Sequence, residues 1–238
     1  MTDRARRFAC AALLLAFALG ADEGGKKQEK GAAKEAAAPD TWYAQLFTHG
    51  DTIVRVDHTW SKGRKLRSEL VVQGRSFLTL VNGDRYIIVD QTGGTGIAIR
   101  RAPEAIALDA KRPNERPFGR EAEGLIAKGA ELVRSDTLNG RPCRVYRKTD
   151  EVGKREIWVT DDKQKLPLRV EFSTRDAGAR TVTDFIEWLS GVDLPDAFFE
   201  PDPRVALETI EYADYVERSK QEPVGPAPVL FAPLLHGK

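Results

Sequence analysis

The sequence predicts a mainly β protein of the α+β class, built on an antiparallel sheet with one apolar and one solvated face. Two observations predict it: apolar and polar side chains alternate along many segments, and glycine-containing turn signals separate those segments. The chain has 238 residues, 41% hydrophobic and 31% charged, which is an ordinary globular balance. Because 37 Lys and Arg residues balance 36 Asp and Glu residues, we expect no nucleic-acid partner.

The start of the chain has the layout of a secretory signal peptide. A basic segment, MTDRARR, precedes the apolar run FACAALLLAFALG and a few small residues. The apolar run is too short to span a bilayer comfortably, so we expect residues 1–20 to be removed on export, leaving no integral membrane segment. An uncleaved anchor is the alternative. Residues 21–40 are charged and alanine-rich, and should form a disordered linker.

The expected domain spans residues 41–218, and most of it reads as strands. Asn-Gly pairs at 82–83 and 139–140 predict hairpins, because both central positions of such a turn need positive φ. The alternating segments are TIVRVDHTW, KLRSELVV, RSFLTLV, RYIIV, AELVRSDTL, RPCRVYRKT, REIWVTD, LPLRVEFST and RTVTDFIEWL.

Helical signals are few. Residues 118–129 carry the clearest one, with Gly129 as a C-cap. Residues 38–47, APDTWYAQLF, are a candidate short helix at the start of the domain. Residues 203–218 fit a helix or a strand, and the alternation at their start favours a strand. The Pro-rich tail, residues 219–238, has four prolines, from which we expect neither regular helix nor central strand.

Residues that usually carry chemistry are scattered. No pair of histidines has metal-ligand spacing, and the chain has no nucleophile elbow, phosphate loop or dinucleotide fingerprint. We therefore expect no metal, no cofactor and no enzymatic activity. The alternative is a hydrolase in which Asp57 and His58 act with Ser173 or Ser190. After export one cysteine remains, Cys143, which we expect to be a small apolar side chain rather than a reactive thiol.

The second half of the chain resembles the outer-membrane lipoprotein carrier (LolA-like) superfamily. An apolar strand ends in aspartate at 158–161, a Leu-Pro-led strand follows at 166–172, and a further strand at 181–188 leads to Leu-Pro-Asp-x-x-Phe at 194–199. In the first half, LVNGDRYIIVD resembles the hairpin that displays a glycine in those carriers. The chain lacks their Arg-Pro-x-x-Phe-Arg-Trp strand, and KLRSELVVQG takes the comparable place.

The resemblance implies a strongly curved antiparallel sheet, an incomplete barrel, with one to three helices covering its concave side. It also implies a periplasmic carrier in a Gram-negative-type cell envelope. Such a protein would hold a lipid, the acyl chains of a lipoprotein or another apolar ligand between sheet and helices. A sensor or scaffold that binds an envelope protein is the alternative.

Alternating apolar positions are the candidate ligand contacts, since a curved sheet must fill its concavity or hold a ligand there. A dry core packed under the helix at 118–129 would use the same side chains. The candidates are Val54, Val56, Leu70, Val72, Leu78, Leu80, Ile88, Trp158, Val170 and Phe172.

The tail ends in a cluster of large apolar residues within PAPVLFAPLLHGK. Each fully buried side chain of this kind contributes roughly 1.5–3 kcal/mol before ordering costs. We therefore predict that the tail docks on its own domain, at a sheet edge or across the cavity mouth, and partly occludes the ligand site. A loose tail is the alternative.

Overall fold

The computed structural model describes residues 40–51, 53–113, 115–175 and 178–237. The expected signal peptide and residues 21–39 of the expected linker lie outside the described residues. The strands are β1 Thr41–Gly50, β2 Val54–Lys62, β3 Lys65–Val72, β4 Arg75–Asn82, β5 Arg85–Asp90, β6 Thr95–Arg100, β7 Glu131–Leu138, β8 Arg141–Thr149, β9 Gly153–Thr160, β10 Pro167–Thr174, β11 Arg180–Ser190 and β12 Ala206–Ile210. The helices are α1 Pro103–Lys111, α2 Glu121–Ala127, the 3₁₀ turn η1 Asp196–Phe199, α3 Tyr212–Ser219 and α4 Ala232–His236.

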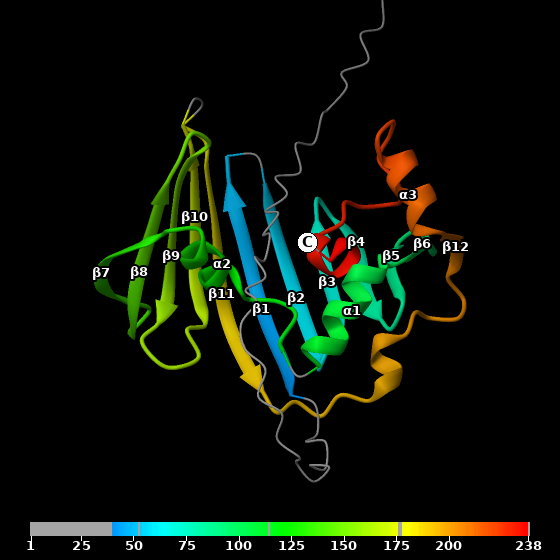
Figure 1. Ribbon diagram of the computed structural model, residues 1–238, viewed down its shortest axis with the longest axis horizontal. Helices are drawn as coiled ribbons and strands as arrows, with labels where there is room; N and C mark the ends of the chain where they lie inside the picture. The colour runs from blue at the N-terminus through cyan, green and yellow to red at the C-terminus, as the bar shows by residue number, and fades with distance from the viewer. Residues whose placement is uncertain (1–39, 52, 114, 176–177, 238) are drawn as a thin grey trace, which may run out of the picture.

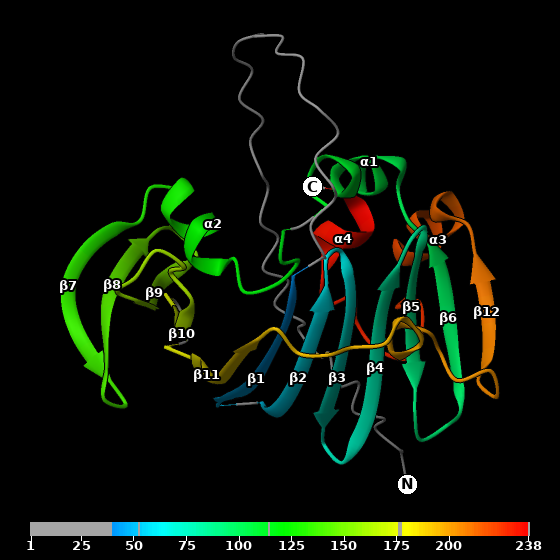
Figure 2. The same cartoon turned by 90° about the horizontal axis from the view of Figure 1, so that it is seen from below.

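All twelve strands form one sheet in the order β12-β6-β5-β4-β3-β2-β1-β11-β10-β9-β8-β7. Every neighbouring pair is antiparallel except β12 and β6, which are parallel. The sheet is open and curved, with β12 at one edge and β7 at the other (Figures 1 and 2). The predicted fold class, a mainly β protein with a curved antiparallel sheet, is confirmed.

Four α-helices lie on the concave side of the sheet (Figure 2), and we call that side the inner face. Helix α2 occupies the segment where a helix was expected and is followed by Gly129 at φ 87°. Residues 203–218 divide into strand β12 and helix α3, so both expectations for that segment hold in part. Helix α1 was not expected. No helix within the described ranges is long and apolar enough to cross a membrane.

Two sequence expectations about helices are wrong. Residues 41–47 belong to strand β1 and not to a helix, because β1 joins the two halves of the sheet by pairing with β2 and β11. The tail also contains a short helix, α4, in which Pro233 stands in the first turn. Proline lacks an N–H, and the first turn of a helix does not need one, so this proline starts the helix instead of preventing it.

Two-residue loops fix the register of the hairpins. At Asn139-Gly140 both residues have positive φ, 51° and 78°, as expected for this turn. The other Asn-Gly pair is placed differently: Asn82 pairs with Arg85, so the turn residues are Gly83 and Asp84, and only Gly83 has positive φ. Both hairpins are formed as predicted, but the first one does not use its asparagine in the turn.

Side chains pack on both faces of the β3–β6 half of the sheet. On the inner face, Tyr86 and Ile99 pack with the buried tail residues Leu234 and Leu235. On the outer face, a second cluster that includes Leu80 packs against the segment before and within β12. The turn η1 contacts β3 and β4. Strands β4 and β5 therefore read as nearly continuous apolar runs, because both of their faces are covered.

Candidate functional site

The inner face of β1–β4 carries a buried patch of small, hydroxyl and charged side chains, which we call the central floor. Strand pairing builds it: Ala44 lies beside Thr59, Thr59 beside Ser68, and Ser68 beside Thr79. In the neighbouring row Asp57 lies beside Leu70. The members of the central floor are Ala44, Asp57, Thr59, Ser68, Leu70 and Thr79, all of them buried.

The two-residue loop between β2 and β3 explains why these residues share a face. Lys62 pairs with Lys65 across that loop, so each β2 residue faces a fixed partner on β3. Thr59 and Ser68 become opposite neighbours, and their hydroxyl oxygens lie 3.2 Å apart in a buried hydrogen bond. A polar side chain on β2 is thereby turned to the same side as Leu66 and Leu70 on β3.

Asp57 and Arg55 place a charged pair on this face. Arg55 Nε lies 3.1 Å from Asp57 Oδ2, and only 7% of the aspartate side chain is exposed. Burial raises the pKa of the Asp57 carboxyl above its usual range, although the positive charge of Arg55 acts to lower it. Neither of the two facing atoms makes a well-aligned hydrogen bond to a described residue. Their interaction is therefore mainly Coulombic.

An aromatic cluster flanks the central floor on the β1–β11 side. Trp188 stacks with Phe118 at a ring distance of 5.5 Å and with Phe185 at 5.4 Å. The guanidinium of Arg116 lies over Trp42 at 4.9 Å and over Trp188 at 4.7 Å. Burial lowers the pKa of Arg116, in the direction expected for a desolvated cation. The indole N–H of Trp188 donates to the Pro167 carbonyl at 2.9 Å, which fixes the ring.

The C-terminal tail packs on the inner face on the β5–β6 side of the floor, which confirms that it docks on its own domain. That it occludes a ligand site stays a prediction. The Phe231 N–H donates to the Tyr86 hydroxyl at 3.2 Å, and the Ala102 N–H donates to the Leu235 carbonyl at 2.9 Å. The buried Arg101 side chain donates to the Leu234 carbonyl at 2.6 Å. Burial also raises the pKa of Tyr86, which therefore stays a neutral hydrogen-bonding group.

The α-helices lie over different parts of the inner face. Helix α2 contacts β8 and β9, whereas α3 contacts β6 and α1 contacts α4. The α4 residues Leu234 and Leu235 belong to the buried cluster that also contains Ala44 of β1, Leu66 of β3 and Val81 of β4. Figure 2 shows α2 over the β7–β10 end of the sheet, α3 beside β6 and β12, and α1 and α4 over the strands between them.

The ten candidate ligand residues divide between the two faces. Ile88 packs in the inner-face cluster under the tail, and Val170 packs near α2. The strand register places Leu70, Val72 and Phe172 on the inner face as well. The five on the inner face are Leu70, Val72, Ile88, Val170 and Phe172.

The other five candidates point to the outer face, so the expectation that all ten point inward is wrong. Leu78 and Leu80 belong to the outer cluster beneath the segment that leads into β12. Trp158 packs with Val145 in an outer cluster on the opposite side of β9 from α2. Val54 and Val56 lie on the other side of β2 from Asp57. Whether any of the ten contacts a ligand stays a prediction.

Sequence reasoning missed the central floor because Asp57 and Thr59 looked like solvent-facing residues. The missing signal was hairpin register. Once the apolar phase of KLRSELVV is known, a two-residue Gly63-Arg64 loop places Thr59 opposite Ser68 and Asp57 opposite Leu70. That reasoning would have assigned Asp57 and Thr59 to the inner face of β2, and Val54 and Val56 to the outer face.

The proposed hydrolase arrangement does not form. Asp57 and His58 are consecutive strand residues and point to opposite faces of the sheet. The Nδ1 atom of His58 lies 2.8 Å from the Tyr43 hydroxyl on the outer face. Among the described residues, no group of three or more His, Cys, Asp or Glu side chains could hold a metal ion.

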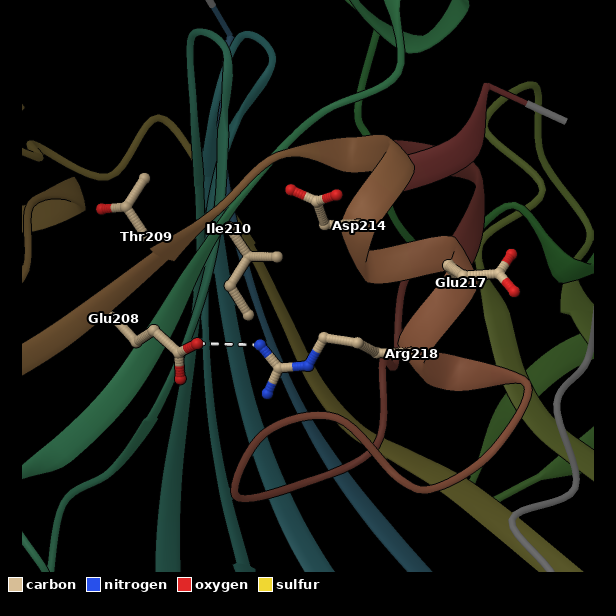
Figure 3. A pocket seen from close by; sticks show the side chains of 6 residues that line it. All are labelled: Glu208, Thr209, Ile210, Asp214, Glu217 and Arg218. Carbon is tan, nitrogen blue, oxygen red and sulfur yellow. Dashed lines mark hydrogen bonds and ion pairs between the residues drawn. The ribbon is translucent and has the colours of Figure 1, made fainter.

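A polar hollow of about 390 Å³ lies between β12 and α3 (Figure 3). Arg218 donates to Glu208 at 2.8 Å across it, and Asp214 and Glu217 line its side. Its lining is charged and open to solvent, so this hollow does not suit an acyl chain.

The curved sheet and the α-helices on its inner face define a class of proteins with a half-barrel sheet. Residues 122–211 match the model of a family described as "Predicted periplasmic protein (DUF2092)". This match agrees with the periplasmic location expected from the sequence. A search of the curated proteins finds no match.

The chain is similar to several solved structures at low sequence identity. An uncharacterized conserved protein from Thermus thermophilus has a TM-score of 0.51 and 10% identity, covering 73% of this chain and 92% of that one. MucB in the Pseudomonas aeruginosa MucA/MucB complex has a TM-score of 0.43 and 14% identity, covering 72% and 59%. A LolA superfamily protein from Nitrosomonas europaea has a TM-score of 0.30 and 16% identity, covering 70% and 92%.

Proposed function

We propose that this protein is an exported, non-enzymatic carrier that binds an apolar ligand, such as the acyl chain of a lipid or lipoprotein, on its inner face. The observation that carries the proposal is the curved sheet with α-helices on its concave inner face. Side chains of α2 and α4 pack on this face, so an acyl chain held there would lie between the sheet and its helices. In this position an acyl chain would lie between the aromatic cluster around Trp188 and the docked tail.

The tail gives the proposed site a second boundary. It buries Val229, Leu234 and Leu235 against the inner face, next to the central floor. We infer that the tail limits access to the floor, because Phe231 and Tyr86 are joined at its border. A ligand that needs more apolar surface would compete with the tail for the same side chains.

Titration of the delipidated protein with the apolar fluorophore 1-N-phenylnaphthylamine tests this proposal. We expect a saturable rise in fluorescence, and a chain truncated after Gln221 should bind the fluorophore more tightly. Native mass spectrometry of protein isolated from its own envelope should show a bound lipid. A titration that does not saturate, together with a mass spectrum that shows no bound lipid, would contradict the proposal.

A protein-binding scaffold is the second candidate, and an apolar outer patch favours it. Val54 is 61% exposed and Val71 46%, and they lie on the neighbouring strands β2 and β3 near Phe47. Exposed apolar clusters of this kind mark interaction surfaces. Pull-down from envelope extracts distinguishes the candidates: a scaffold would recover a protein partner that Val71→Asp abolishes, whereas a carrier would recover lipid with either form.

A further inference from the structure

Strands β10 and β11 separate before β11 ends, and this leaves an open edge inside the sheet. Their pairing stops at Arg169 and Asp184, whereas β1 pairs with β11 as far as Ser190. Figure 1 shows the second part of β11 running on beside β1, past the point where β10 begins. We call residues 185–190 the open segment, and four of its six residues are exposed. Its backbone groups that face away from β1 can therefore accept a further strand.

Local irregularities explain why the two strands separate. Leu168 is skipped in the pairing of β10 with β9, and Ile186 is skipped in the pairing of β11 with β1. Strand β10 also begins with Pro167, which has no N–H to donate to a neighbour. Its carbonyl accepts from the indole of Trp188 at 2.9 Å, so a side chain takes the place of a backbone partner. Bulges of this kind end strand pairing and redirect side chains next to functional sites.

A hollow of about 180 Å³ lies beside the open segment. Its lining comes from the turn between β7 and β8 and from the two strands that separate, and most of it is apolar. The lining residues are Leu138, Asn139, Arg141, Leu168, Phe185 and Ile186. A cavity of about 150 Å³ can hold a benzene molecule, so this hollow has room for one apolar side chain. Ile186 is 55% exposed, so the hollow can be reached from solvent on the β11 side.

Arg141 gives the hollow a positive charge that is not neutralised within the described part of the chain. This exposed arginine makes no hydrogen bond or ion pair with another described residue. The side chain of Asn139 lines the same hollow, whereas Glu187, the next residue after Ile186, does not line it. Because a guanidinium binds carboxylates through paired hydrogen bonds, the hollow suits an acidic group that stands next to an apolar one.

We propose that the open segment and this hollow bind an extended, acidic segment of a partner protein, which adds to β11 as a further strand. The partner backbone pairs with the open segment, one apolar side chain enters the hollow, and a carboxylate contacts Arg141. In strand addition of this kind, main-chain hydrogen bonds give affinity and side-chain pockets give specificity. The site lies apart from the central floor and from the outer patch of Val54 and Val71, so it does not depend on the proposed function.

Fluorescence anisotropy with two sets of synthetic peptides tests the site. All peptides alternate valine and threonine over eight residues, with a single aspartate at each position in turn in one set and a single lysine in the other. The best acidic peptide should bind wild type about threefold to fivefold more tightly than any basic one, the range of an exposed ion pair. Arg141→Met should remove this preference. Ile186→Glu puts a carboxylate on the strand edge and should weaken acidic binding by about tenfold or more.

Two variants serve as matched controls. Lys111 is an exposed cation at the end of α1 that also has no partner among the described residues, so Lys111→Met should keep the preference for acidic peptides. Val152 in the turn between β8 and β9 is 56% exposed, close to the value for Ile186, and Val152→Glu should keep the wild-type affinity. Because Arg141 and Ile186 are exposed, both test variants should fold.

Hydrogen exchange separates strand addition from other kinds of binding. The amides of the open segment should exchange more slowly when the acidic peptide is bound to wild type, and no such protection should form in Ile186→Glu. Failure of all the peptides to bind, equal binding of acidic and basic peptides, or binding without protection of the open segment would overturn the proposal. Protection that rises with protein concentration in the absence of peptide would overturn it in favour of a second copy of this chain.

Discussion

Asp57 shows how one buried residue couples the inner face to pH. Its carboxyl has an ordinary pKa of 3.8 when solvated, and burial in the fold raises it. The folded chain therefore binds this proton more tightly than the unfolded chain does. The stabilisation that this bound proton gives the folded chain is fully present below the ordinary pKa. It is lost as the pH rises through the higher pKa of the folded state.

We expect the difference in unfolding free energy between wild type and Asp57→Asn to change with pH in that direction. The variant side chain cannot lose a proton, so the unfolding free energy of the variant should increase relative to that of the wild type as the pH rises above about 4. Urea unfolding at a series of pH values measures the difference. Asp202→Asn is the control: the Arg204 side chain lowers the pKa of the exposed Asp202 to about 2, so any pH effect there has the opposite sign. A pH-independent difference for Asp57→Asn would contradict the expectation.

The two asparagines of the Asn-Gly pairs differ in backbone conformation, and this difference is testable. Asn139 has φ 51°, whereas Asn82 is not among the residues with positive φ. Asn139→Ala should therefore destabilise the protein by about 1 kcal/mol through backbone strain. Asn82→Ala should cost less, since it loses only an exposed hydrogen bond to Glu200. Equal losses in chemical denaturation would show that the turn conformation has no energetic effect.

At the scale of elements, the C-terminal tail belongs to the core of the β5–β6 half. Leu235 is fully buried and its carbonyl accepts from the backbone of Ala102, at the start of α1. Gly225 has φ 94°, and a Cβ at this position would lie 2.5 Å from Ile97 Cδ1. The tail thus lies close to the sheet, and an added methyl group would force either the tail or the Ile97 side chain to shift.

Leu235→Ala should lower the unfolding free energy by about 2–5 kcal/mol, the usual range for a buried leucine. Leu230→Ala is the matched control within the same tail, because Leu230 is only partly buried, and it should cost on the order of 1 kcal/mol or less. Chemical denaturation measures both, and hydrogen exchange should show protected tail amides in the wild type. Equal, small losses for the two variants would mean that the tail is not docked in solution.

The sequence predicted elements well wherever local pairing decides them. Most of the strands that run from Val54 to Ser190 follow from alternation and turn residues, and α2 follows from its periodicity and Gly129. The face of each strand was less predictable. In RSFLTLV and RYIIV both faces are apolar, because the segment around β12 covers the side that a half-exposed sheet leaves to solvent. The segment that covers this face is distant in the sequence, so periodicity could not indicate on which face of the sheet Leu80 lies.

The strand β1 and the central floor could not be predicted for the same reason, because distant segments determine them. TWYAQLF has no clean alternation, since Trp42 and Leu46 pack on the inner face while Tyr43 and Phe47 lie on the outer one. Its strand conformation comes from its central position between β2 and β11. A short polar segment at Asp57 carries no local sign of burial. Only the pairing of β2 with β3 determines it.

At the scale of the whole molecule, one continuous sheet carries two separate inner-face clusters. Leu125 of α2 packs with Ile157 and Val159, whereas Leu235 of α4 packs with Tyr86 and Ile99. The cluster of Leu235 also contains Ala44 of β1, Leu66 of β3 and Val81 of β4, so it extends over the central strands.

This separation predicts how core mutations combine. Leu125→Ala and Leu235→Ala should have additive effects on the unfolding free energy, within about 0.5 kcal/mol, because they share no packing partner. Ile99→Ala combined with Leu235→Ala is the matched control, since both side chains belong to one cluster and should couple by about 0.5–3 kcal/mol. Double-mutant cycles in urea, without ligand, measure the coupling free energy of each pair. Strong coupling between Leu125 and Leu235 in the ligand-free protein would mean that the two clusters act as one core.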